Sequence, residues 1–177
     1  KIDGKKNVTI DLNGYTINGS GYDGVINAVN GATVTIDGRD ANSAITANED
    51  RGYAMAVCAY GQGTKVTING GSYTQNITGT GDQFDMIYAS DKATIEILNG
   101  YFKSATPKWT LNLKDNDGAT MLVKGGSFVD YDPSNSQSEN PPADFVADGY
   151  KVSESNGVYT VSKKSSGGSH RYDGYIT

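Results

Sequence analysis

At residues 66–73 the chain reads Val66-Thr67-Ile68-Asn69-Gly70-Gly71-Ser72-Tyr73. Apolar and polar residues alternate at its start, two glycines form a turn, and an aromatic residue follows. The same order of strand, glycine turn and apolar residue occurs five times along the chain. The equivalent apolar anchors are Leu12, Ile36, Ile68, Ile97 and Val123, at intervals of 24, 32, 29 and 26 residues. A repeat of this length predicts a solenoid, in which each unit packs on its neighbours.

A second short apolar run precedes each of the later anchors. These runs cover residues 25–29, 54–59, 86–89 and 109–113, and turn-forming residues separate them from the anchor strands. Apolar and polar residues alternate with a period of two, which predicts strands rather than helices. Because strands of the same rank resemble one another, we predict an all-β fold, a single-stranded right-handed parallel β-helix of about five coils.

Stacking of like strands places side chains in columns along the solenoid axis. We predict two inward apolar columns. The first contains Ile10, Val34, Val66, Ile95 and Met121, and the second contains Leu12, Ile36, Ile68, Ile97 and Val123. A third column just past the glycines reads Ile17, Ala41, Tyr73, Phe102, Phe128, so aromatic rings should stack at one corner. An outward column reads Asp11, Thr35, Thr67, Glu96, Leu122 and is mostly polar, as a solvated face should be.

Composition agrees with a single β-rich domain. The 177 residues include 23 glycines and 4 prolines, which suits many tight corners. The net charge is −5, and no group of basic residues alternates with aromatic ones, so neither nucleic-acid binding nor membrane insertion is expected. Cys58 lies in an apolar run and is predicted to be a buried free thiol. Since the chain opens on Lys1 without Met, we expect an excerpt of a longer protein or a processed product.

The chain changes character after the last repeat. A polar loop leads to two alternating strands joined at Asn156-Gly157, which predicts a β-hairpin. An open β-helix end exposes unpaired backbone, so this hairpin is expected to cap it. We therefore predict coils over residues 1–131, a loop plus capping hairpin over 132–162, and a flexible tether and tail, including His170, over 163–177.

Nearly the whole chain resembles a known kind of module. The stretches 8–17, 66–73 and 125–128, with the later Phe145-Val146-Ala147-Asp148-Gly149-Tyr150, resemble right-handed parallel β-helix modules of large gut-bacterial surface proteins and of phage tail or head-fibre proteins. The same scaffold is similar to that of pectate-lyase-type enzymes. The resemblance implies a non-enzymatic structural or adhesion module of an extracellular fibre, located at a bacterial cell surface or on a virion.

A polysaccharide-active lyase or glycoside hydrolase is the alternative. Such enzymes need charged residues that converge on one face over adjacent coils. In the outward column only Asp11 and Glu96 are acidic, and they are not in neighbouring coils. The Asp115-Asn116-Asp117-Gly118 stretch lacks the later Glu of a calcium loop and is interpreted as a turn. We therefore predict no catalytic residue, no metal site and no cofactor.

Sugar or receptor binding is the activity that the aromatic composition favours. The chain has 12 tyrosines and one tryptophan against four phenylalanines, and rings with a polar tip suit glycans and protein partners. We name Tyr60, Tyr88 and Tyr101, expected to be exposed, and Trp109, expected to be mostly buried, as candidate binding residues. Two alternatives stay open: rings that only line the corners of a fibre, and a homo-oligomer, favoured by the outward Leu98 and Leu122.

Overall fold

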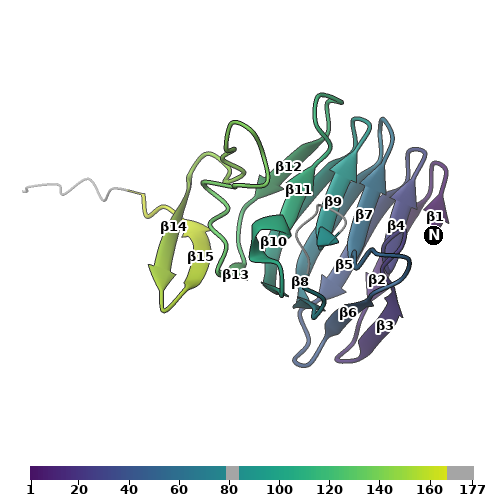
Figure 1. The fold of residues 1–177 in the computed structure, drawn as a ribbon, viewed down its shortest axis with the longest axis horizontal. Helices are drawn as coiled ribbons and strands as arrows, with labels where there is room; N and C mark the ends of the chain where they lie inside the picture. The colour runs from purple at the N-terminus through teal and green to yellow at the C-terminus, as the bar shows by residue number, and fades with distance from the viewer. Residues whose placement is uncertain (79–83, 167–177) are drawn as a thin grey trace, which may run out of the picture.

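The computed structural model describes residues 1–78 and 84–166 and is an all-β solenoid of about 4 turns (Figure 1). The predicted fold class, a parallel β-helix, is confirmed. The predicted count of about five coils is slightly too high, because five stacked anchor strands are joined by only four complete turns of the chain. The predicted tail residue His170 lies outside the described residues.

Two parallel sheets form the walls of the solenoid (Figure 1). The five-stranded sheet contains β1 (Ile2–Asp3), β4 (Ile26–Val29), β7 (Val57–Tyr60), β9 (Ile87–Ser90) and β11 (Leu111–Leu113). The ten-stranded sheet wraps the other sides and contains β2 (Asn7–Asp11), β3 (Thr16–Ser20), β5 (Thr33–Gly38), β6 (Ala44–Asn48), β8 (Lys65–Gln75), β10 (Thr94–Ser104), β12 (Thr120–Val123) and β13 (Ser127–Val129), with β14 (Tyr150–Ser155) and β15 (Val158–Lys163) of the hairpin.

The inward columns stack as predicted from the second coil onward, and the first coil requires a correction. Its two inward positions are Val8 and Ile10, not the predicted Ile10 and Leu12. A slip of two residues keeps every side chain on the same face, so alternation alone cannot distinguish the two registers. Leu12 is nevertheless buried, and its backbone N–H donates to the carbonyl of Asp37 in the next coil.

The corner column needs a similar correction in the second coil. Ile45, rather than the predicted Ala41, stacks between Ile17 and Tyr73, while Ala41 is exposed in the preceding turn. At this corner β5 and β6 are separated by a turn, whereas in the next two coils β8 and β10 pass through the same corner as continuous strands. The length of a turn differs from coil to coil, so the residue that occupies the corner column in the second coil could not be predicted from the repeat.

The aromatic corner itself forms as predicted. The ring of Phe102 stacks between those of Tyr73, at a centroid distance of 5.0 Å, and Phe128, at 4.8 Å, with both pairs within 9° of parallel. All three side chains are fully buried. The hydroxyl of Tyr73 donates to the carbonyl of Gly70 at 2.9 Å, so the one polar atom of the stack has a partner.

Successive coils approach most closely at the glycine corner. A Cβ placed on Gly38 would lie 2.5 Å from the carbonyl oxygen of Gly70, and Gly70 itself has φ of +94°. A side chain at Gly38 would therefore clash with backbone, and one at Gly70 would also strain the main chain. This close contact explains why the repeat carries glycine after the anchor strand.

The C-terminal hairpin covers the last coil. Strand β15 pairs antiparallel with β13, and β14 pairs with β15, so the hairpin extends the sheet at one end of the solenoid (Figure 1). Asn156 and Gly157 have φ of +51° and +78°, the conformation expected of an Asn-Gly hairpin turn. Before the hairpin, Phe145 packs into the core and accepts a hydrogen bond from the N–H of Val123. None of the described helical segments has the length and apolar character needed to cross a membrane.

An ion-paired ladder crosses the outer face of three coils. The carboxylate of Glu96 on β10 lies 3.2 Å from the ammonium of Lys65 on β8 and 3.1 Å from that of Lys124. Burial would raise the pKa of Glu96, but the hydrogen bonds from Lys124 and Lys65 outweigh it and lower that pKa below its ordinary value of 4.5. The ladder thus stabilises the charged carboxylate.

We expect Glu96→Gln to lower the free energy of unfolding by about 1 kcal/mol at neutral pH. Since the folded-state pKa is lowered, this stabilisation is present above pH 4.5 and is lost as the pH falls through the folded-state value. Urea unfolding of both proteins should therefore show a difference that shrinks on acidification. Asp40→Asn, on an exposed turn, is the control, and a difference that grows in acid would contradict the assignment.

Candidate functional site

Three of the four predicted binding residues meet on the five-stranded sheet. Tyr60 ends β7, Tyr88 lies in β9, and Trp109 ends a 3-10 turn (Pro107–Trp109) just before β11. The rings of Tyr60 and Tyr88 make an edge contact with centroids 5.9 Å apart. Tyr101 lies on β10 of the other sheet, 41% exposed, and takes no part in this cluster.

Tyr60 and Tyr88 are half-buried and so less exposed than predicted, and of the four candidate residues only Tyr101 is exposed. Trp109 is half-buried, in line with the expectation of a mostly buried ring with a wet edge. The rings of Tyr60 and Tyr88 are half-buried, and each covers part of the other. The outward position of Tyr60 and Tyr88 was predictable from strand alternation, whereas their partial burial was not.

A chain of three adjoining cavities follows these rings. Tyr60 and Tyr88 line a cavity of about 350 Å³, and Tyr88 and Trp109 line a second of about 310 Å³. The two cavities share Tyr88 and Lys114 in their walls, and a third of about 250 Å³ shares Tyr22 and Asp23 with the first. We call the three together the aromatic groove. It is lined by the rings of Tyr22, Tyr53, Tyr60, Tyr88 and Trp109.

The floor of the aromatic groove is a buried row on the outer face of the sheet. Parallel pairing aligns Asn27, Cys58, Tyr88 and Asn112 on β4, β7, β9 and β11. An outer face open to water would leave such residues exposed, yet Asn27 is 8%, Cys58 0% and Asn112 6% exposed. The sheet therefore has a second buried layer outside the solenoid core.

Two amide oxygens in this row lack protein partners. Within the described residues, the buried Oδ1 atoms of Asn27 and Asn112 accept no hydrogen bond. The Nδ2 group of Asn112 donates to Asp85 Oδ2 at 2.9 Å. Buried acceptors are normally satisfied, so these two enclosed oxygens are exceptions in the buried outer layer of the sheet.

One wall of the groove comes from the chain between β6 and β7. The ring of Tyr53 makes an edge contact with that of Tyr22 at 5.4 Å, and the Arg51 guanidinium lies 3.6 Å over the Tyr22 ring. The backbone of Gly21 holds this segment, because its N–H donates to Asn48 and its carbonyl accepts from Met55. Tyr22 and Tyr53 were not predicted from the sequence, since both lie in connecting segments whose path is set by tertiary contacts.

Two carboxylates line the same cavity as Tyr60. They belong to Asp23, which is exposed, and to Asp85, which is 3% exposed, and the exposed Lys114 shares that cavity. The pair was not predicted from the sequence, because neither carboxylate lies in a column next to an anchor strand. Both lie two or three positions before a strand of the five-stranded sheet, and a search of that column could have found them.

Burial sets the protonation of the groove's weak acids. It raises the pKa of the Cys58 thiol to about 12 and raises the pKa of the Tyr60 phenol well above its ordinary value. Both groups are therefore neutral at physiological pH. Cys58 is the buried thiol that was predicted, and Tyr60 keeps a hydroxyl that can both donate and accept.

The Asp115–Gly118 stretch forms a turn between strands. Asp117 accepts hydrogen bonds from the N–H groups of Ala119 and Asp91, so its carboxylate braces two neighbouring loops. In the part of the chain that the structure describes, no group of three or more His, Cys, Asp or Glu residues is arranged to hold a metal ion. Leu98 and Leu122 are each 37% exposed, on the outward side as predicted.

Comparisons of the chain with protein-family models, with curated proteins and with solved structures find no match. The likeness to β-helix modules of gut-bacterial surface proteins and phage fibres therefore stays a prediction at the level of family. The structure shows the β-solenoid itself. On this solenoid, the five-stranded sheet carries a ring-lined groove with buried polar atoms beneath it.

Proposed function

We propose that this chain is a non-enzymatic carbohydrate-binding module of an extracellular fibre or surface protein, and that it attaches to a surface glycan through the aromatic groove. The observation that carries the proposal is the convergence of Tyr60, Tyr88 and Trp109 on one concave strip. These rings come from segments about 20–30 residues apart, and the solenoid brings them side by side. A bacterial cell surface or a virion is the proposed location.

The chemistry of the groove suits sugars. A pyranose presents an apolar face of C–H groups and a rim of hydroxyls, which matches a ring with a polar tip above buried amides. The rings stand on or beside strands of a rigid sheet, so little order has to be imposed when a ligand binds. A structural fibre needs neither a cavity nor unpaired buried acceptors on its outer face.

Polysaccharide cleavage is the second candidate, and one observation favours it: Asp23 and Asp85 line the same cavity. Paired carboxylates are the usual catalytic groups of glycoside hydrolases. Two features weigh against this role. Asp85 already accepts a hydrogen bond from Asn112, and burial raises the pKa of Tyr60, so its phenol stays protonated and is not available as a base.

We expect Tyr88→Ala to weaken glycan binding at least about tenfold, because Tyr88 lines two of the three cavities of the aromatic groove and anchors of this kind dominate binding. The measurement is a glycan-array screen followed by titration of the retained glycan. Tyr101→Ala removes the same ring from the other sheet and should leave the affinity unchanged.

Two results would count against the binding module. Equal losses in Tyr88→Ala and Tyr101→Ala would show that the groove is not the site, and an array without any retained glycan would contradict glycan attachment. The release of new reducing or unsaturated ends from the retained glycan, abolished in Asp85→Asn, would favour the enzyme instead.

A further inference from the structure

Asn-Gly pairs are points at which a protein chain can react with its own backbone. Glycine has no Cβ, so its nitrogen can come close to the side-chain amide of the asparagine before it. The chain has six such pairs, at residues 13–14, 18–19, 30–31, 69–70, 99–100 and 156–157. Because the dipeptide is the same each time, differences in reactivity within the folded protein come from the surroundings of each pair.

In five of these pairs the fold engages the glycine elsewhere. Three glycine N–H groups donate to the side chains of other residues: Gly14 to Ser43, Gly31 to Thr64 and Gly157 to Glu154. Gly19 and Gly70 lie in strands, where they are paired with Ala47 and Gly38 of neighbouring coils. A glycine held in this way has to leave its partner before its nitrogen can attack, which slows the reaction.

The pair Asn99-Gly100 is arranged differently. The N–H of Gly100 donates to Oδ1 of Asn99 at 2.9 Å, so this nitrogen lies against the amide group of the side chain. The pairing of β10 with β8 passes from Asn99 to Tyr101, and its pairing with β13 begins at Tyr101, so both ladders pass over Gly100. The Asn99 side chain is exposed. The two reacting groups are therefore already in contact, at a position that water reaches.

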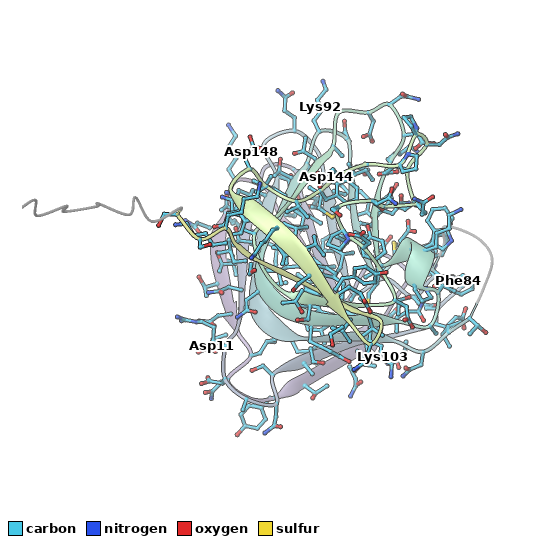
Figure 2. All side chains as sticks on the ribbon, turned by 90° about the vertical axis from the view of Figure 1, so that its left-hand side faces the viewer. Asp11, Phe84, Lys92, Lys103, Asp144 and Asp148 are labelled. Atoms are coloured by element: carbon cyan, nitrogen blue, oxygen red, sulfur yellow. The ribbon has the colours of Figure 1, made fainter. Side chains whose placement is uncertain are left out.

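The strand around this pair can also accommodate a longer main chain. Asn99 is the central residue of β10, and the register with β8 shifts on both sides of it, between Ile97 and Asn99 and between Asn99 and Tyr101. Figure 2 shows Lys92, which precedes β10, and Lys103, next to its last residue, on opposite sides of the molecule, so the irregular stretch lies midway along a long strand. An extra main-chain atom disturbs less pairing at such an irregularity than in a regular ladder.

We propose that Asn99 is a site of spontaneous deamidation, and that it is the first asparagine to convert in the folded chain. The Gly100 nitrogen loses its proton to hydroxide and attacks Cγ of Asn99. The bond from this nitrogen to Cγ forms, the Cγ–Nδ2 bond breaks, and Nδ2 takes a proton from water and leaves as ammonia. Water then opens the resulting succinimide. Addition at Cγ gives aspartate, and addition at the main-chain carbonyl gives isoaspartate, in which the main chain runs through the side chain.

The test keeps the whole folded chain at mildly alkaline pH and follows each Asn-Gly pair by peptide mapping. We expect Asn99 to convert at least about tenfold faster than Asn69, with release of one ammonia for each conversion. Asn69 is the matched control, because it carries the same dipeptide at the paired position of the neighbouring coil. Conversion of Asn69, or of any of the other four asparagines, at the rate of Asn99 would overturn the proposal.

Unfolding separates the effect of the fold from that of the flanking residues. In urea the six pairs should convert at similar rates, because none is held in a particular geometry. A preference for Asn99 that persists unchanged in urea would show that the arrangement at Gly100 does not cause it, and would overturn the proposal.

A pair of variants identifies the product in the intact protein. Each conversion adds one negative charge to a chain of net charge −5, so the product separates on ion exchange. Asn99→Gln keeps the amide on a longer side chain, which cannot form the five-membered ring, and should remove the main acidic form. Asn69→Gln makes the same change in the neighbouring coil and should leave that form in place. An acidic form that is unchanged in Asn99→Gln would contradict the assignment.

Discussion

Phe102→Ala is expected to lower the free energy of unfolding by about 3–5 kcal/mol, the largest loss we predict for a single side chain. The ring of Phe102 is fully buried and stacks on both sides, at 5.0 Å on Tyr73 and 4.8 Å on Phe128. Its removal leaves a cavity between two coils that rigid strands cannot close. Urea unfolding followed by circular dichroism measures the loss.

The neighbouring residue supplies the control. Tyr101 precedes Phe102 on β10 but points outward and is 41% exposed, so Tyr101→Ala should change stability by less than about 1 kcal/mol. A loss from Phe102→Ala as small as that from Tyr101→Ala would show that the corner rings do not hold the coils together. If Phe102→Ala fails to accumulate, Phe102→Leu retains most of the volume and should still unfold at lower urea than the parent.

Gly21→Ala is expected to cost about 3 kcal/mol of stability and to abolish glycan binding at the aromatic groove. A Cβ at Gly21 would clash with the backbone of Ala54 and Met55, and backbone cannot move aside as the end of a side chain can. The segment that carries Tyr53 would have to shift away from Tyr22, which would open one wall of the groove. Thermal unfolding and titration of the retained glycan report the two effects.

Gly19→Ala is the matched control, since it lies two residues earlier on the same stretch of chain. The atoms nearest to its Cβ would all belong to the side chain of Val25, with Cγ1 at 2.9 Å, Cγ2 at 3.2 Å and Cβ at 3.4 Å, whereas at Gly21 they belong to the backbone. We expect a smaller loss of stability and retained binding. Full glycan affinity in Gly21→Ala would show that the wall formed by Tyr22 and Tyr53 is not part of the site.

Much of the fold was predictable because its signals are local. Alternation in Val66 to Ile68 assigns a strand, and the glycines at 70 and 71 predict a corner. The two register errors in the apolar columns arose at Leu12 and Ala41, where the lengths of the turns, rather than the pattern of the strands, set the register. A slip of two positions leaves the apolar pattern intact, so nothing in the pattern could have signalled it.

The candidate site was predictable only in part. Tyr60 and Tyr88 stood out because outward positions beside turns suit exposed rings, and Tyr101 met the same criterion on the other sheet. The position of a residue along a strand shows whether its side chain points outward, but it does not show which of the two sheets carries that strand. Asn112 was missed because it is buried on an outer face that strand alternation assigns to solvent, and Asp85 because it lies in the segment before β9 and not beside an anchor strand.

By itself, the sequence determined that this chain stacks β-strands turn upon turn around an apolar axis, closed by an Asn-Gly hairpin, because alternation and turn chemistry act over a few residues. Only the tertiary structure decided that Tyr22, Tyr53, Tyr60, Tyr88 and Trp109 line one groove over unpaired amide oxygens. Those rings come from separate coils and connecting segments, and their meeting depends on the register between coils and on the path of the chain around Gly21. Neither the register between coils nor this chain path can be predicted from a short stretch of residues, because both depend on contacts between distant segments.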